Sequence, residues 1–586
     1  MHGLQRVLAF FLLSCSYLTA ATVLVNFQVA QPPPVPKDAK QCTIQILQRD
    51  FAFSFGLAEV VQFAPPTDCG PVGSWAAVTL NFTVTSNGTQ FDRLGIFTFQ
   101  NVEIWRTSTP EPTRGDGIIW TYEKDVTRYI PLFAKPGTFI LQLDNLIQTG
   151  LDGIYSTVLH ATFYASSPKH PPAKKADVLI PISNLRNDTG NDVSVPPAFS
   201  LNVTVPQNAV EIYAELYASG NGNEEFWYFN TANKFVSSLP AGVTLGQGPF
   251  REVRILVDAR VAGTAYPYAT IFTGGVIPSS WRPISAYGAL DLPTYFLDLT
   301  PFVPILTDGK PHTISLDVTS AEDDHTILQN WFLSGVLQVV TDPSGRPTRG
   351  SMTRYSVQPF SQTKTNGNVA DNGDVVVTVS ATRSLRIEST IISGSGKVNK
   401  VVWTQNMQYE NTQNFLDDAS IQDFVQSASG TFRSTHNGIT VVEDQFSYPL
   451  SINLTLLDPI KSTFDHSYNR KLLPSPLIVA SDIQERQTAT GFFTLSPNGN
   501  FGNGTNSNTF SYVDAAGNTY FRTVNAALNN ITLDHQSGTL APSPVPAVSS
   551  ARVIVQQPLG LLPSEDTFGG ARLPGGRGNT VGETAN

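Results

Sequence analysis

The sequence predicts an all-β protein, and three observations support this class. Charged residues make up only 14% of the 586 residues, against ~25% in a typical soluble domain. Gly, Pro, Thr, Ser and Asn replace them, which is the composition of strands and turns rather than of helices. Apolar and polar residues alternate in short segments such as 77–84 and 92–99, and no long amphipathic helical pattern competes with them. At roughly 100–200 residues per domain, the length predicts about three domains.

The first 40 residues read as a leader and a linker. Residues 1–21 are predicted to be a signal peptide, with Arg6 before an apolar run and small residues at Thr19–Ala21 for cleavage. The apolar run extends to about residue 27, so an uncleaved signal anchor is the alternative. Residues 22–40 include several prolines and are expected to form a stiff linker.

Three strand-rich regions follow. Residues 41–165 are predicted to be a β-sandwich domain, and residues 166–206 a connector. A second β-sandwich is expected over 207–345, with strands such as 209–217, 252–257 and 331–340. Residues 350–559 are expected to form an accessory β region that packs on the other two, with strands near 374–380, 385–392 and 439–457. The tail, 560–586, is rich in Gly and polar residues and is expected to be disordered.

Cysteines and glycosylation motifs favour export. Of three cysteines, Cys15 lies in the leader, so Cys42 and Cys69 are predicted to form a disulfide; two buried thiols are the alternative. We therefore expect a secreted protein, or one anchored in the secretory pathway if the leader is retained. Asn-x-Ser/Thr motifs, which are possible glycosylation sites in an exported chain, begin at Asn81, Asn87, Asn187, Asn202, Asn453, Asn503 and Asn530.

Charge excludes one class of partner, and residue clusters indicate another. The net charge is −10 and no basic run occurs, so a nucleic-acid partner is not expected. Between residues 211 and 312, carboxylates, arginines and tryptophans recur among short apolar segments, as in Glu224-Glu225-Phe226-Trp227 and Trp281-Arg282. Tryptophan faces stack on pyranose rings, so these clusters indicate a polar site with aromatic walls that binds sugar.

Several motifs together resemble the plant and fungal peptide:N-glycanase A family. They occur in the family's order and cover about residues 41–345 strongly and the C-terminal region more weakly. The resemblance implies an amidase that removes N-linked glycans from glycopeptides. The motifs are Phe91–Arg93, Glu103–Pro110, Gly117–Trp120, Glu225–Tyr228, Gly248–Val253, Phe272–Pro278, Trp281–Ile284 and Asp308–His312.

More distant bacterial peptide N-glycosidase F enzymes imply the fold and the site. Their two jelly-roll-like domains hold the site at their interface, so the same arrangement is expected here. Their catalytic aspartate resembles Asp92 of Phe91-Asp92-Arg93, and their second-domain glutamate resembles Glu225, with Glu224 as the competing match. Asp144 and Arg282 match a further acid and an arginine more loosely. Cysteines around that glutamate in the bacterial enzymes are missing here, so the local loop is expected to differ.

The chemistry implied by the resemblance is hydrolysis of the β-amide of a glycosylated Asn. Asp92 is expected to activate or align the water, and Glu225 to hold that water or donate a proton. Arg282 is expected to polarise the carbonyl or to bind the sugar. Trp227 and Trp281 would form walls against N-acetylglucosamine. Arg106 and Asp144 are further expected substrate contacts.

Each of these residues also has a structural alternative. Asp92 could form an ion pair with Arg93 in a turn, and Glu224-Glu225 could be a solvated turn. The tryptophans could be core residues, and Arg106 could form a salt bridge with Glu103. The histidines offer no metal-binding spacing, and no Gly-x-Ser-x-Gly motif occurs. We therefore predict no metal, no cofactor and no covalent nucleophile.

The function predicted from sequence is that of a peptide-N4-(N-acetyl-beta-glucosaminyl)asparagine amidase acting on N-glycosylated peptides or proteins. Two other classes stay open. A carboxylate pair with tryptophan walls also suits a glycoside hydrolase acting on N-glycans, and a non-catalytic carbohydrate-binding protein needs only the tryptophans. A membrane contact is expected only if the leader is an uncleaved anchor.

Overall fold

The computed structural model describes residues 23–113, 115–473, 477, 480–494, 500–542 and 561–562. Antiparallel strands dominate these residues, which confirms the all-β prediction. The described helices are single turns, and none is long and apolar enough to cross a membrane. The expected signal peptide and most of the expected disordered tail lie outside the described residues. The α-helices are α1 (Ile130–Phe133), α2 (Asn233–Val236) and α3 (Val303–Leu306).

The first region contains two sheets whose side chains share one core. Alternate residues of each strand point inward, so that Phe82, Phe97 and Trp105 meet in the interior; Phe97 and Trp105 stack with ring centroids 4.8 Å apart. One sheet has the order β1 (Leu24–Asn26), β7 (Ile118–Asp125), β4 (Ala77–Ser86), β9 (Tyr155–Tyr164), β2 (Gln41–Phe51). The other has the order β3 (Glu59–Phe63), β8 (Gly137–Leu143), β5 (Leu94–Phe99), β6 (Val102–Ser108).

A disulfide joins Cys42 on β2 to Cys69 in the β3–β4 connection, as predicted, with Cα atoms 5.9 Å apart. The two residues are 27 positions apart, and a cross-link closing such a loop stabilises a fold by roughly 3 kcal/mol in the chain-entropy treatment.

The second region also contains two sheets. Val253 of β14, Leu316 of β17 and Leu337 of β18 are among the residues that contribute to its core. One sheet has the order β10 (Val178–Ile182), β18 (Asn330–Thr341), β13 (Ala209–Asn221), β16 (Tyr295–Asp298), with β11 (Val193–Val195) also on β18. The other has the order β12 (Phe199–Val203), β17 (His312–Thr319), β14 (Glu252–Val257), β15 (Arg260–Ala265).

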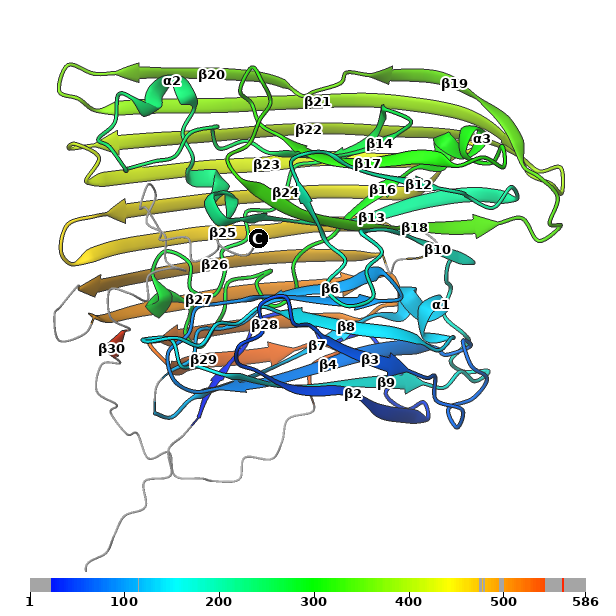
Figure 1. Ribbon diagram of the computed structural model, residues 1–586, viewed down its shortest axis with the longest axis horizontal. Helices are drawn as coiled ribbons and strands as arrows, with labels where there is room; N and C mark the ends of the chain where they lie inside the picture. The colour runs from blue at the N-terminus through cyan, green and yellow to red at the C-terminus, as the bar shows by residue number, and fades with distance from the viewer. Residues whose placement is uncertain are drawn as a thin grey trace, which may run out of the picture.

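The C-terminal region is one wide sheet of long strands, in which β21 to β29 lie side by side in chain order (Figure 1). Both β19 and β20 pair with β21, and β30 pairs with β27. Buried and exposed residues alternate along each strand, so one face packs inward and the other faces solvent. Its strands are β19 (Arg349–Val357), β20 (Gln362–Val369), β21 (Val375–Ile392), β22 (Val398–Leu416), β23 (Ile421–His436), β24 (Ile439–Thr455), β25 (Ile460–Leu473), β26 (Ser481–Thr494), β27 (Asn500–Asp514), β28 (Thr519–Ala527), β29 (Asn530–Ser537) and β30 (Leu561–Leu562).

Buried amide side chains fasten this sheet to the second region. Gln405 accepts a hydrogen bond from the Thr264 N–H at 2.9 Å and donates to the Thr264 carbonyl at 2.8 Å. Gln413 donates to the Asn230 carbonyl at 2.9 Å and Asn506 to the Ser280 carbonyl at 2.8 Å. These amides form hydrogen bonds with backbone groups of the second region that have no neighbouring strand as a partner. The inner face of the sheet therefore combines apolar packing with hydrogen bonding.

Residues 24–29, within the expected linker, join the first and second regions. β1 pairs in parallel with β7, and Phe27 forms a bridge to Ile284. Asn26 accepts a hydrogen bond from Ser285 Oγ at 2.6 Å, and Gln28 accepts one from the Leu290 N–H at 2.8 Å. The segment therefore contributes to the junction between the two regions.

Candidate active site

Two carboxylates from the first region meet a glycine from the second. Asp92 precedes β5, and Glu111 follows β6 after a short Pro-rich turn. The Gly274 N–H lies 3.5 Å from Asp92 Oδ2. A Cβ added to Gly274 would lie 2.3 Å from Glu111 Oε1 and 3.2 Å from Asp92 Oδ1. Only a residue without a side chain lets both carboxylates approach this backbone.

Hydrogen bonds from several directions hold the Asp92 loop in place. Tyr155 Oη donates to the Phe91 carbonyl at 2.7 Å. Arg93 donates to Gln90 Oε1 at 2.7 Å and to Asn145 Oδ1 at 3.3 Å. Because each neighbour of Asp92 is fixed, the carboxylate has a defined position, as a catalytic group requires.

A threonine pair connects the loops that carry the site across the two regions. The Arg93 N–H donates to Thr109 Oγ1 at 2.8 Å. Thr273 Oγ1 donates to the Thr109 carbonyl at 2.6 Å. Thr109 lies two residues before Glu111, and Thr273 immediately precedes Gly274. This chain of hydrogen bonds fixes the two carboxylates relative to the glycine.

Burial makes the two carboxyl groups unusual acids. Burial raises the pKa of Asp92 to about 6, against the smaller opposing effects of the Gly274 N–H and Arg93. Burial and the nearby Asp92 charge raise the pKa of Glu111 to about 8, although Arg282 and Arg93 oppose the shift. Neighbouring carboxyl groups with separated pKa values can act as a base and an acid at the same pH.

Two guanidinium groups accompany the carboxylates. Arg282 Nη2 lies 3.8 Å from Glu111 Oε2 and donates to the Glu111 carbonyl at 3.3 Å. Burial lowers the pKa values of both Arg282 and Arg93, but nearby carboxylates counter that shift. Arg282, expected from sequence to polarise a carbonyl or to bind sugar, is therefore part of the same cluster as Asp92.

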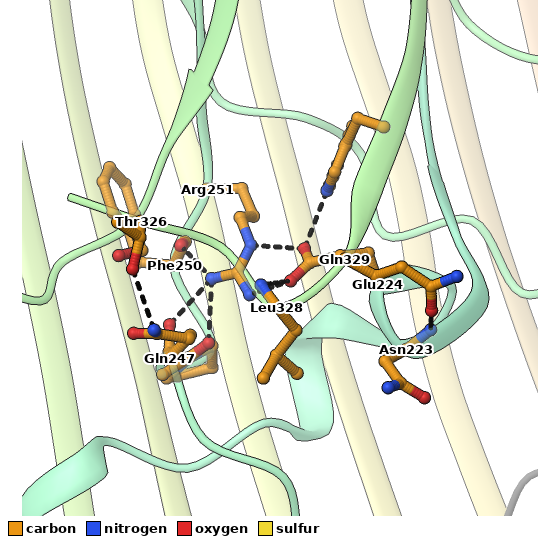
Figure 2. A network of polar contacts seen from close by, with 12 residues as sticks. Asn223, Glu224, Gln247, Phe250, Arg251, Thr326, Leu328 and Gln329 are labelled. Carbon is orange, nitrogen blue, oxygen red and sulfur yellow. Dashed lines mark hydrogen bonds and ion pairs between the residues drawn. The ribbon is translucent and has the colours of Figure 1, made fainter. Parts of the chain in front are cut away.

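Glu224, the competing catalytic match, lies in a different and saturated network (Figure 2). Arg251 donates to its two oxygens from Nε at 2.6 Å and Nη2 at 2.7 Å. Trp331 Nε1 and the Leu328 N–H donate to it as well, each at 2.7 Å. The Glu224 and Arg251 side chains are both 0% exposed. These contacts anchor Glu224 within the second region, and its side chain cannot turn toward a substrate without breaking the network.

Glu225 has different surroundings from Glu224. It is half-buried, and its charge contributes to raising the pKa of Tyr228, after the larger effect of burial. The ring of Phe226 lies 3.2 Å from the position that a Cβ on Gly275 would take. The Phe226 ring thus borders Gly275, which directly follows the glycine that faces Asp92 and Glu111.

The two tryptophans expected to be sugar walls lie in the core. Trp227 is 3% exposed and packs near Trp331, with ring centroids 6.1 Å apart. Trp281 is 1% exposed, donates from Nε1 to the Gly275 carbonyl at 2.8 Å, and packs on Phe464. Both tryptophans therefore fit the alternative of core residues better. Trp281 also holds the Gly275 backbone through its hydrogen bond.

Arg106 and Asp144, the remaining expected substrate contacts, are anchored by protein groups. Arg106 is fully buried, forms a two-point ion pair with Glu103 at 2.7 and 2.8 Å, and donates to Ser219 Oγ at 2.8 Å across the junction. Asp144 accepts hydrogen bonds from the Gly56 N–H and from Gln142, and burial raises its pKa. It acts electrostatically on Arg93, so it is a neighbour of the Asp92 loop rather than part of the pair.

Comparison with known proteins identifies the chain's relatives. The profile of the family described as peptide N-acetyl-beta-D-glucosaminyl asparaginase amidase A matches residues 31–358. The chain belongs to this family. The profile of the PNGase A C-terminal domain matches residues 376–450. A relative from Prunus dulcis, peptide-N4-(N-acetyl-beta-glucosaminyl)asparagine amidase A, is 34% identical over 415 residues, covering 68% of this chain and 71% of the relative.

Membership of the amidase A family confirms the resemblance drawn from the motifs, and with it the prediction of an amide hydrolase that removes N-glycans. Glu111 was not among the site residues expected from the sequence. A signal was present, since Glu111 directly follows the motif Glu103–Pro110 within a Pro-Glu-Pro turn at a strand end. Among the residues that the structure describes, no group of three or more His, Cys, Asp or Glu is placed to hold a metal ion.

Proposed function

We propose that the chain hydrolyses the β-amide between glycosylated Asn and the first N-acetylglucosamine of N-glycopeptides, with Asp92 and Glu111 as its catalytic pair. The products are an Asp-containing peptide and a glycosylamine. The observation that carries this proposal is the convergence of the two carboxylates, with pKa values of about 6 and 8, on the Gly274 backbone. An amide needs both a base for water and an acid for the leaving nitrogen.

The separated pKa values support a division of roles between the two carboxyl groups. Between pH 6 and 8, Asp92 is ionised and Glu111 holds its proton. Asp92 takes a proton from the attacking water as its oxygen bonds to the amide carbon. Glu111 gives its proton to the nitrogen as the C–N bond breaks. The glycosylamine leaves neutral, and the new carboxyl group stays on the peptide.

The arginines supply the electrostatic part of the mechanism. With one proton on the carboxyl pair, the group formed by Asp92, Glu111, Arg93 and Arg282 has a net charge of +1. A positive, partly buried site favours the negative oxygen that forms when water adds to the carbonyl. Arg282 is the better candidate for that contact, because Gln90 and Asn145 already hold Arg93.

Glu225 is proposed as a substrate contact beside this pair. Its neighbour Phe226 packs against Gly275, so a substrate bound at the adjacent Gly274 would pass close to this segment. On this assignment, Glu225→Gln raises KM more than it lowers kcat, whereas Glu111→Gln lowers kcat.

Mass spectrometry of a defined glycopeptide incubated in ¹⁸O water tests the function. We expect the peptide to carry Asp with one ¹⁸O and the glycan to be released intact. Peptide that retains N-acetylglucosamine would identify a glycoside hydrolase instead. Glycan binding without any cleavage would favour a binding protein. Asp92→Asn serves as the control, because it removes the base without changing the side-chain shape.

Export and the finer architecture are also proposals. The Cys42–Cys69 disulfide fits an oxidising compartment, in line with a secreted or signal-anchored protein. Asn87, Asn187, Asn202, Asn453 and Asn530 are exposed and open to glycosylation, whereas Asn81 and Asn503 are half-buried. The paired sheets of the first and second regions support two jelly-roll-like domains over 41–165 and 207–345, with the site at their interface.

A further inference from the structure

A trough of about 780 Å³ crosses the C-terminal sheet. Its walls come from six neighbouring strands, β21 to β26, which run side by side (Figure 1). The wall side chains are exposed or half-buried, whereas inward neighbours such as Arg383, Met407 and Phe446 are buried. The trough therefore lies on the outer face of the sheet, opposite the face that packs on the second region.

Strand register arranges the wall residues in two rows. Each member pairs with the next across the strands, so each row runs perpendicular to the chain direction. At ~4.8 Å between strands, a row across six strands is about 24 Å long. One row is Ser384, Asn406, Thr431, Gln445, Lys471 and Asp482, and the other is Thr382, Gln408, Ser429, Ser447, Asn469 and Gln484.

The chemistry of the rows is uniform. In the two rows, every side chain except Lys471 and Asp482 carries a hydroxyl or an amide. Lys471 stands directly opposite Asp482, so the two charges cancel within the wall. The next outward row on one side contains Arg386, Arg433 and Glu443, and is not neutral in the same way. Two arginines also line the trough, but Arg470 is paired with Asp444 and Arg383 with Glu252. The trough thus offers many neutral donors and acceptors and no unpaired arginine.

The occupant must match that chemistry. A nucleic acid or an acidic peptide would require net positive charge. An extended peptide would require free backbone groups, but each of the strands β21 to β26 is paired on both sides. A sugar chain presents neutral hydroxyls along its whole length, which amide and hydroxyl side chains can match.

We propose that this trough binds a neutral oligosaccharide, namely the glycan arms of the N-glycosylated substrate. The proposal rests on the proposed function only for the source of the sugar. The trough is lined by none of the residues of the Asp92–Glu111 site, so it would act as a second contact for large glycans. Free glycan should bind it even where no amide bond is available for hydrolysis.

Calorimetric titration of the full chain with a free, neutral oligomannose N-glycan tests this. Ser447→Tyr fills the trough, and we expect Kd to rise at least tenfold, a loss of ~1.4 kcal/mol. Ser451→Tyr is the matched control, because Ser451 is exposed on the same strand and face but does not line the trough; its Kd should stay within about twofold of the parent value. All samples carry Asn453→Gln, so that no sugar on β24 competes.

Two outcomes would overturn the proposal. One is equal affinity of Ser447→Tyr and Ser451→Tyr for the glycan. The other is loss of binding in Asp92→Asn but not in Ser447→Tyr, which would place all glycan binding at the amidase site and leave the amidase function intact. Gln408→Ala removes a wall amide without adding bulk, so it tests the trough even if the tyrosine variant misfolds. It should weaken glycan binding about threefold. Turnover of a glycopeptide with a single sugar should not change in any trough variant.

Discussion

Glu111 and Glu224 are both almost completely buried near the junction of the first two regions, but their surroundings differ. Glu224 accepts four short hydrogen bonds from Arg251, Trp331 and Leu328. Glu111 has one guanidinium at 3.8 Å and the charge of Asp92 nearby. A saturated carboxylate stabilises the fold, whereas an undersatisfied one keeps a proton that it can transfer.

The largest effect is expected at Asp92. Asp92→Asn removes the base but keeps the shape, and kcat should fall at least about 10³-fold. The measurement is turnover of a glycopeptide by mass spectrometry, with circular dichroism to show that the variant is folded. Near-parental kcat in a folded variant would remove Asp92 from the mechanism.

The opposite result is expected at Glu224. Glu224→Gln leaves the Arg251 charge buried without a counter-charge, so the free energy of unfolding should fall by about 3–5 kcal/mol. Activity per folded molecule should stay within about threefold of the parent. Urea unfolding measures the first quantity. A stable but inactive Glu224→Gln variant would contradict the view that Glu224, unlike Glu111, serves the fold.

Gly274→Ala tests the geometry that brings the carboxylates together. The added Cβ would come within 2.3 Å of Glu111 Oε1, and the flexible end of Glu111 can move away. We expect kcat to fall about 10²-fold because the pair is displaced, with little change in the unfolding midpoint. Loss of stability equal to that of Glu224→Gln would show that this glycine serves the fold instead.

The pH dependence of kcat/KM should follow the two raised pKa values. It should rise as Asp92 ionises near pH 6 and fall as Glu111 loses its proton near pH 8, by about tenfold per unit outside these limits. In Glu111→Gln the alkaline limb should disappear. An alkaline limb unchanged in that variant would assign the acid to another residue.

A further effect concerns the dependence of stability on pH. The pKa of Glu111 is higher in the folded than in the unfolded chain, so the folded state binds more protons and stability falls as pH rises from about 4 to about 8. Glu111→Gln removes this loss. At pH 9 the variant should be more stable than the parent by several kcal/mol, roughly 1.4 kcal/mol for each unit by which the pKa is raised, and at pH 4 the two should be equal. Thermal unfolding at both values measures the difference.

Much of the first two regions could be predicted from alternation, but the wide sheet could not. Its strands were expected as short pieces, such as 374–380 and 385–392, whereas β21 continues through Val375–Ile392. Inward positions of the sheet carry buried amides such as Gln405 and Gln413. These interrupt the hydrophobic alternation, although the backbone continues unbroken. Buried polar residues with distant partners cannot be told from exposed ones in a sequence.

The candidate site could likewise be predicted only in part. Asp92 stands in a recognisable motif, but its partner Glu111 is a single carboxylate in a turn, and only folding places both beside Gly274. Trp227 and Trp281 were expected to form sugar-binding walls, because a sequence does not show whether an indole is buried or exposed. Their indoles lie in the core.

The N-terminal segment has a consequence for the order of folding. Asn26 and Gln28 are among the first described residues, yet their partners Ser285 and Leu290 come 259 and 262 positions later. At ~5–20 residues per second, a ribosome needs on the order of ten seconds or more to supply them. The junction between the two regions therefore closes late in synthesis. In hydrogen exchange of nascent chains, the Phe27 amide, which donates to the Pro283 carbonyl, should gain protection after those of β4 and β9.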